Sequence, residues 1–148
     1  MSCNRNHAML FSKDSAAVMV GGGAGAVCRV MLGEAVMRTM GAPLGFPLGI
    51  LCVNVLGGFL MGLLQGGMRR AGKPFRAGYL LLGTGFLGGF TTFSTFSLDT
   101  LLLFRHSAPL AGLNVILNVS LCVCAVRAGY ALLAPRAATG FPRRISVQ

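Results

Sequence analysis

Four long blocks of apolar residues, separated by short polar or proline-containing stretches, constrain this chain more than any other feature. We place the blocks at about 16–37, 46–67, 76–103 and 109–134. A helix that crosses the hydrocarbon core of a bilayer needs roughly 20 mostly apolar residues, so each block is long enough to cross once. The pattern predicts an all-α membrane protein with four transmembrane helices.

The charge content excludes an ordinary soluble domain and makes an enzyme a poor interpretation. Of the 148 residues, 54% are hydrophobic and 11% are charged, whereas soluble domains carry about 25% charged residues. The three acidic residues, Asp14, Glu34 and Asp99, lie far apart in the sequence. Paired-carboxylate catalysis and most metal sites need carboxylates close together. We therefore expect no catalytic site and no catalytic metal.

The cysteines fit small buried side chains better than disulfides. Their number, five, is odd, and four of them fall inside apolar blocks. Cys122 and Cys124 are separated by one residue, whereas redox and zinc motifs separate their cysteines by two. We interpret both as small hydrophobic residues of the last block.

The basic residues flank the apolar blocks, as membrane anchors do, and form no solvated stripe of the kind that binds nucleic acid. Four crossings return the chain to the side on which it started. Nine of the 13 basic residues lie on that side: Arg5, Lys13, Arg69, Arg70, Lys73, Arg76, Arg136, Arg143 and Arg144. Only Arg38 and Arg105 lie on the other side, and the remaining two, Arg29 and Arg127, lie within the predicted spans. The positive-inside rule then places both termini in the cytoplasm, and we expect a multi-pass protein of the cell (inner) membrane.

The first block is the one whose start is ambiguous. Asp14 or Ser15 would cap a helix that begins at about residue 16. Arg5 and Lys13 resemble the start of a signal peptide, but the block is long, lacks a small-residue cleavage site and carries Arg29 late in its run. We interpret it as a retained span. The chain then divides into an N-terminal cytoplasmic tail 1–15, a transmembrane domain 16–134 and a basic C-terminal tail 135–148.

Glycines at helical spacing give the first two blocks faces of small residues. They run from Gly21 to Ala26 in the first block and include Gly57, Gly58 and Gly62 in the second. Small faces allow helix backbones to approach closely in lipid, which predicts a tight bundle or dimer. The alternative is that glycine is simply common in membrane helices.

Two polar residues inside the blocks are functional candidates, because such residues are costly in a membrane unless they have a partner. Arg29 either attracts an anion or ties its helix to a neighbour, or else it extends toward the lipid headgroups. The Asn54 amide lies in an apolar run and needs a partner, which is either another helix or a ligand. Both pairs of alternatives remain open from the residues alone.

The third block combines glycine pairs with threonines, which are poor helix formers, so we expect its helix to break from Gly88 to Thr92. Inside a membrane, irregular backbone occurs only where it lines a cavity or is buried in protein. The carbonyls that such a break frees are suited to holding a cation.

The residues after the break are suited to an anion. Phe93 and Phe96 are three apart and share a helical face, with Ser94 and Thr95 beside them. Aromatic rings have positive edges, so ring edges, hydroxyls and the Asn54 amide offer an anion partial positive charge. The alternative is a packed phenylalanine cluster whose hydroxyls bond back to the helix.

Three stretches resemble the Fluc (CrcB) family of fluoride channels in order and spacing. They read Gly-Gly-Gly-Ala-Gly-Ala-Val-Cys-Arg at 21–29, Pro-Leu-Gly-Ile-Leu-Cys-Val-Asn-Val-Leu-Gly-Gly-Phe at 47–59, and Gly-Phe-Leu-Gly-Gly-Phe-Thr-Thr-Phe-Ser-Thr-Phe-Ser at 85–97. The resemblance covers about 16–134, and the 85–97 stretch is its most specific part. It implies a passive fluoride exporter that relieves fluoride toxicity. In that family the channel is an antiparallel, dual-topology dimer with two fluoride pores and a structural sodium ion at its centre.

Roles carried over from the family fall on matching residues of this chain. Asn54 is similar to the family's pore asparagine, and Phe93 and Phe96 are similar to the phenylalanines that line the anion path. Gly88 and Thr91 match the positions whose main-chain carbonyls hold the sodium ion.

The first and fourth blocks carry the remaining matches. Arg29 matches the family's first-helix arginine, although Val30 replaces the aromatic residue that often follows it. Polar residues of the fourth block include Asn114, Asn118 and Ser120. The predicted fluoride pore comprises Asn54, Phe93, Phe96, Ser94, Thr95, Asn118 and Ser120.

Three other interpretations compete with a homodimeric channel. The uneven charge distribution favours one orientation in the membrane, so the subunit could pair with an oppositely oriented paralogue. A small multidrug transporter would need a membrane-embedded carboxylate, but Glu34 lies near the end of its span beside Arg38. A non-transporting assembly subunit would use its polar residues only to join helices.

Overall fold

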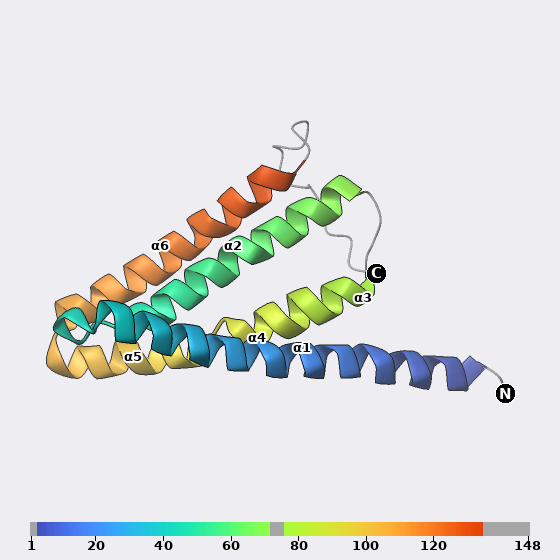
Figure 1. Ribbon diagram of the computed structural model, residues 1–148, viewed down its shortest axis with the longest axis horizontal. Helices are drawn as coiled ribbons and strands as arrows, with labels where there is room; N and C mark the ends of the chain where they lie inside the picture. Colours follow the sequence, from blue (N-terminus) through green and yellow to red (C-terminus); the bar gives the residue numbers. More distant parts are fainter. Residues whose placement is uncertain (1–2, 72–75, 135–148) are drawn as a thin grey trace.

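The computed structural model describes residues 3–71 and 76–134, which are helical almost throughout (Figure 1). The elements are α1 (Cys3–Met40), the 3-10 helix η1 (Pro43–Gly45), α2 (Leu48–Ala71), α3 (Arg76–Gly78), the π-helix η2 (Tyr79–Leu87), α4 (Gly88–Phe90), α5 (Phe93–His106) and α6 (Ala108–Leu133). The described part of the chain contains no strand. The all-α prediction is confirmed.

The helices form two closely packed pairs. Helix α2 lies along α6, and α1 lies along η2 and α4 (Figure 1). The two pairs meet where α1 leads into α2 and where α5 turns into α6, and they diverge toward the opposite end (Figure 1). The start of α1 and the end of α6 therefore lie toward the same side of the molecule (Figure 1).

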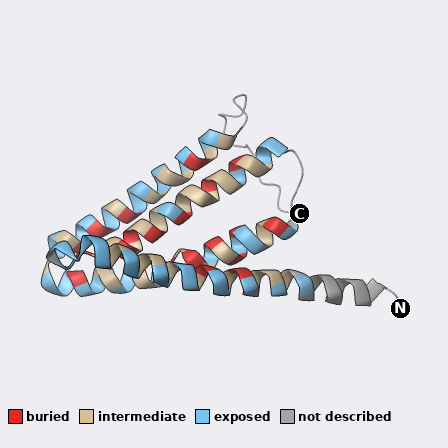
Figure 2. Cartoon of the chain, in the orientation of Figure 1, coloured by how far each residue is buried: buried red, intermediate tan, exposed pale blue. Residues whose placement is uncertain are grey.

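Three of the described helices are long and apolar enough to cross a membrane, over Lys13–Met40, Leu48–Ala71 and Ala108–Leu133. The third predicted block is divided among α3, η2, α4 and α5. Buried residues occupy narrow stripes along the helix contacts, and much of the remaining surface is exposed (Figure 2). Large apolar side chains face outward, including Met19 and Leu132. An apolar surface of this extent indicates a helical membrane protein.

The predicted helix boundaries hold at the fourth block and fail at the first. Helix α6 begins at Ala108 and has Pro109 in its first turn, as expected. The predicted start near residue 16 is wrong, because α1 begins at Cys3 and continues through Asp14 and Ser15. Residues 3–15 contain no glycine or proline that would end a helix. The apolar run begins near residue 16, whereas the helix that contains it begins at Cys3.

Some predicted features lie outside the described residues. These are the basic C-terminal tail 135–148, together with Lys73 and Pro74 of the loop between the second and third blocks.

Glycines set the distance between α2 and α6. A Cβ atom placed on Gly62 would meet the Val126 carbonyl and would lie 2.8 Å from the Tyr130 nitrogen. A Cβ atom on Gly129 of the opposing helix would meet the Phe59 carbonyl. The two main chains are in contact, and only glycine fits there. The prediction of a tightly packed small face is confirmed for Gly62.

The first glycine face packs in the same way against the divided segment. Cβ atoms on Gly21 and Gly25 would meet main-chain atoms of Leu81 and Phe86, respectively. A Cβ atom on Gly89 would likewise meet the Gly22 carbonyl of α1. By contrast, Gly23 has nothing near it and tolerates a side chain on geometric grounds.

We predict that Gly62→Ala destabilises the protein, because the new methyl group collides with the main chain of α6 rather than with a movable side chain. Overpacking of this kind costs about 1–3 kcal/mol. The matched control is Gly112→Ala on α6, where a Cβ atom meets nothing within 4 Å. Thermal unfolding in detergent should show a lower melting temperature for Gly62→Ala alone. Equal melting temperatures would contradict the close approach of α2 and α6.

Candidate functional site

The main chain of the third segment breaks where the sequence predicted. Helix α4 ends at Phe90 and α5 begins at Phe93, with Thr91 (φ −78°, ψ 154°) and Thr92 (φ −147°, ψ 124°) extended between them. The Thr92 hydroxyl accepts a hydrogen bond from the Thr95 main-chain N–H at 3.2 Å. Thr92 is therefore the N-cap of α5.

Asn54 of α2 pairs with both main-chain groups of Thr92. Its side-chain oxygen accepts from the Thr92 N–H at 2.9 Å, and its amide nitrogen donates to the Thr92 carbonyl at 3.2 Å. The asparagine thus replaces the hydrogen bonds that the extended residue cannot make within a helix. Asn54 has a structural role, and its position beside the break leaves an additional ligand role open.

Among the carbonyls at the break, those of Gly88 and Thr91 lack their usual helical partners. In a continuous helix the Gly88 carbonyl would accept from the Thr92 N–H, and the Thr91 carbonyl would accept from the Thr95 N–H. Both N–H groups donate elsewhere, the first to Asn54 and the second to the Thr92 hydroxyl. Carbonyl oxygens are the ligands that hard cations prefer, so Gly88 and Thr91 have the chemistry that the predicted sodium ion requires.

A chain of side-chain hydrogen bonds continues from Asn54 across α6 to α5. Asn54 donates to the Asn118 side-chain oxygen at 3.3 Å, and Asn118 donates to that of Asn114 at 2.9 Å. Asn114 donates to the Thr100 hydroxyl at 2.8 Å, and this hydroxyl donates to the Phe96 carbonyl at 2.7 Å. We call Asn54, Asn118, Asn114 and Thr100 the amide ladder.

A cavity of about 410 Å³ lies beside the break. It brings together six of the predicted site residues: Asn54, Gly88, Thr91, Phe93, Phe96 and Asn118. Asp, Glu, Lys and Arg are all absent from its lining. The cavity is therefore a neutral, mostly apolar space whose lining includes the two amide residues Asn54 and Asn118.

The two phenylalanines stand together at this cavity but differ in exposure. Their ring centroids are 5.6 Å apart, with an angle of 50° between the ring planes. Phe96 is 9% exposed, whereas Phe93 is 79% exposed. The predicted shared face is confirmed, and the Phe93 ring faces outward.

The other hydroxyls of the predicted pore lie outside the cavity. Ser94 and Thr95 are within hydrogen-bonding distance of the Thr92 hydroxyl, at 3.1 and 3.2 Å. Ser120 is exposed on α6 and donates to the Ile116 carbonyl at 2.5 Å. The Ser120 hydroxyl is therefore bonded back to its own helix.

The remaining charged candidates also lie outside the cavity. Arg29 is half-buried on α1 and has no hydrogen-bond or ion-pair partner among the described residues. Glu34 forms an exposed ion pair with Arg38 at 2.8 Å. An exposed, paired carboxylate is unsuited to the proton exchange of a multidrug transporter.

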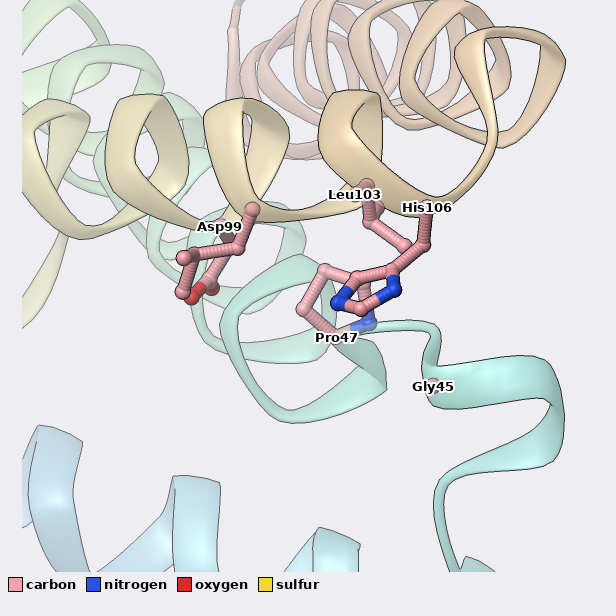
Figure 3. Close-up of a pocket in the computed structure, with 6 residues that line it drawn as sticks. Gly45, Pro47, Asp99, Leu103 and His106 are labelled. Atoms are coloured by element: carbon pink, nitrogen blue, oxygen red, sulfur yellow. The ribbon is translucent and has the colours of Figure 1, made fainter.

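A second cavity, of about 530 Å³, lies at the far end of α5 (Figure 3). Asp99 and His106 of α5 both line it, and the His106 ring lies beside Pro47, which directly precedes α2 (Figure 3). Nowhere among residues 3–71 and 76–134 do three or more His, Cys, Asp or Glu side chains form a group suited to a metal ion. The four cysteines whose side chains are described are free thiols.

Sequence reasoning gave no site role to three residues of this site. Thr92 is the N-cap of α5, and a threonine just before a helix start is a recognisable capping signal. Asn114 and Thr100 complete the amide ladder, and Asn114 is fully buried. The four-residue spacing of Asn114 and Asn118 places both on one helix face, but only the fold brings Thr100 next to them.

Comparison with known proteins identifies a matching family and several similar proteins. A family described as CrcB-like protein, Camphor Resistance (CrcB), matches residues 16–130. A Pseudoalteromonas translucida protein named fluoride-specific ion channel FluC is 45% identical over 111 residues, covering 72% of this chain and 88% of the relative. Proteins with the same name are 46% identical over 117 residues in Phenylobacterium zucineum (78% of this chain, 91% of the relative) and 45% identical over 122 residues in Shewanella oneidensis (80% and 94%).

We predict that Asn54→Leu destabilises the protein as well as changing its site, because it leaves the Thr92 N–H and carbonyl unpaired. A buried polar group that loses its partner costs about 1–3 kcal/mol. The control Gln65→Leu also replaces an amide side chain by leucine, at an exposed position of α2. Thermal unfolding should separate the two variants. An unchanged melting temperature for Asn54→Leu would show that the break does not depend on this side chain.

Proposed function

The chain belongs to the CrcB family, and we propose that it is a fluoride-selective ion channel that lets fluoride leave the cytoplasm passively. It is a multi-pass membrane protein and a channel rather than an enzyme. The observation that carries the proposal is the neutral cavity in which Asn54, Phe93 and Phe96 meet beside a helix break. Its lining offers partial positive charge to an anion and contains no charged side chain that would hold the ion permanently.

Fluoride is small and strongly hydrated, so the pore must replace the water that it loses on entering a medium of low dielectric constant. Three kinds of group supply replacements here. The Asn54 amide has N–H donors, the rings of Phe93 and Phe96 have positive edges, and the N-terminus of α5 carries a partial positive charge. None of these is a full charge, so the ion is stabilised and still able to move on.

Selectivity follows from the size of the track, and direction follows from the membrane potential. Chloride is larger and fits poorly between an amide and the two ring edges, so ligand geometry favours fluoride. Fluoride enters cells as the neutral acid and dissociates in the neutral cytoplasm. An inside-negative potential then drives the anion outward with about 2.3 kcal/mol per charge for each 100 mV. Export in this way relieves fluoride toxicity without another energy source.

We propose that a second copy covers the exposed face of the break, giving an antiparallel dimer of subunits that each cross the membrane four times. Phe93 is 79% exposed and Gly88 is also exposed, although both lie beside irregular backbone. Such backbone is not tolerated against lipid, so protein must cover it. Within this dimer, the outward-facing Ser94 and Ser120, together with Thr95, complete the anion path, and Arg29 draws anions toward it.

A structural sodium ion at the dimer centre fits the freed carbonyls of Gly88 and Thr91. Two carbonyls from each copy would supply an oxygen cage, and sodium would supply the positive charge that holds four carbonyl dipoles together. The residues of this chain keep these carbonyls free, because Asn54 and Thr92 capture the N–H groups that would otherwise pair with them.

We predict that proteoliposomes containing only this purified chain release fluoride rapidly and retain chloride. A fluoride electrode measures the release after valinomycin has made the membrane permeable to potassium, so that potassium can leave together with fluoride. Release by this chain alone would also show that no paralogue is needed. No release from a folded preparation, and none after co-expression with an oppositely oriented paralogue, would favour a non-transporting assembly subunit.

We predict that Phe93→Leu lowers fluoride release by about tenfold or more, because the variant keeps an apolar side chain but loses the positive ring edge. Phe93 is largely exposed in the subunit, so its replacement does not create a core cavity. The control is Phe104→Leu, since Phe104 is 63% exposed on the same helix and does not line the cavity. Wild-type release by Phe93→Leu would exclude this ring from the anion path.

We predict that the dimer melts at a lower temperature when sodium is replaced by potassium or N-methyl-D-glucamine. A ligand present at 100 times its dissociation constant stabilises the folded state by about 2.7 kcal/mol. The measurement is thermal unfolding after exhaustive cation exchange, followed by return of sodium. Identical melting temperatures in all three cations would contradict a structural sodium ion.

A further inference from the structure

The amide ladder has a direction. Every donor in it points from Asn54 toward Phe96: Asn54 donates to Asn118, Asn118 donates to Asn114, Asn114 donates to Thr100 and the Thr100 hydroxyl donates to the Phe96 carbonyl. Each amide therefore turns its oxygen toward Asn54 and its nitrogen away from it. The ladder presents the Asn118 oxygen to the cavity, which is the wrong end of that amide for an anion.

Main-chain groups fix this direction at both ends. The Phe96 carbonyl can only accept, so the Thr100 hydroxyl donates to it and must accept from Asn114. At the other end the Thr92 N–H can only donate, so the Asn54 oxygen faces it and the Asn54 nitrogen faces Asn118. Once the two ends are set, turning over any single amide between them would place two oxygen atoms opposite each other in place of a hydrogen bond.

The donors that fluoride needs are already in use when the ladder has this direction. The Asn54 nitrogen donates to the Thr92 carbonyl and to the Asn118 oxygen, which accounts for both of its N–H groups. Both N–H groups of Asn118 go to Asn114, to its side-chain oxygen at 2.9 Å and to its main-chain carbonyl at 3.1 Å. The longest link of the ladder, 3.3 Å, joins Asn54 and Asn118, which both line the cavity.

We propose that fluoride enters between Asn54 and Asn118 and reverses the remainder of the ladder. This inference rests on the proposed fluoride channel and concerns how its site is controlled. The Asn118 amide turns its nitrogen to the ion, Asn114 turns its nitrogen to the Asn118 oxygen, and the Thr100 hydroxyl turns from Phe96 to donate to the Asn114 oxygen. Fluoride then receives N–H donors from both Asn54 and Asn118.

The reversal is possible because amide oxygen and nitrogen occupy nearly the same positions after a half-turn, so the contacts between neighbouring side chains persist. It also has a cost, which favours the observed direction when no anion is bound. Asn118 gives up its bond to the Asn114 main-chain carbonyl, and Thr100 gives up its bond to the Phe96 carbonyl. The two new bonds to fluoride replace them. Thr100 and Asn114 do not line the cavity, so they act as positioning residues for Asn118.

Replacement of Thr100 tests the reversal, because the reversal predicts that losing this hydroxyl strengthens fluoride binding instead of weakening it. In Thr100→Val the observed direction loses two hydrogen bonds, one from Asn114 and one to Phe96, whereas the reversed direction loses one. The fluoride concentration that gives half-maximal release should therefore fall by about fivefold, the effect of one hydrogen bond. Thr100→Ser keeps the hydroxyl and should restore the wild-type value. Thr84→Val makes the same change at an exposed position of η2 and serves as the control.

A merely structural Thr100 would weaken fluoride binding or leave it unchanged, and either result would overturn the proposal. A second measurement does not depend on the variant's folding. In the wild-type protein, fluoride should shift the side-chain amide NMR signals of both Asn118 and Asn114, with one common dissociation constant, and chloride should shift neither. If the wild type releases fluoride while the Asn114 signals stay fixed, the reversal is wrong and the channel proposal stands. If the wild type releases no fluoride, the channel proposal itself fails.

Discussion

The unpaired main chain at Thr92 is the constraint on which the rest of this site depends. A break in a membrane helix exposes N–H and carbonyl groups that no water can satisfy, so another part of the protein must do so. Asn54 forms hydrogen bonds with both groups of Thr92, and the Thr92 hydroxyl accepts a hydrogen bond from the Thr95 N–H. These two side chains lower the free-energy cost of the break. Because they accept hydrogen bonds from the Thr92 and Thr95 N–H groups, the carbonyls of Gly88 and Thr91 do not pair with those groups.

The glycine faces place Asn54 within reach of the break. Helix α2 lies between the divided segment and α6, and it must approach both closely enough for one asparagine to bond to each. A Cβ atom on Gly57 would meet the Thr91 methyl group, and one on Gly58 would lie 3.2 Å from the Cys122 carbonyl. Glycine one turn after Asn54 thus removes the side chains that would hold the helices apart. The close packing and the polar site are parts of one arrangement.

Sequence predicted the coarse architecture and the break because both follow from local composition. Apolar runs mark spans, and adjacent glycines and threonines are poor helix formers wherever they stand. The sequence could not give the start of α1, since polar residues without glycine or proline continue a helix beyond the apolar run. Nor could it show that the Ser120 hydroxyl bonds back to its own helix or that Thr100 lies beside Asn114. Those contacts depend on side-chain direction and on the packing of α5 against α6.

The pairing also explains how a polar site is tolerated in an apolar surrounding. Throughout the described part of the chain, every buried side-chain nitrogen and oxygen has a hydrogen-bond partner. A site whose donors remained unpaired without an ion would hold that ion tightly, because its departure would leave buried polar groups unsatisfied. Here the Asn118 oxygen takes the Asn54 donor that an anion would use. In the proposed channel, this protein group would take the place of an ion that leaves, and conduction requires such a balance between binding and release.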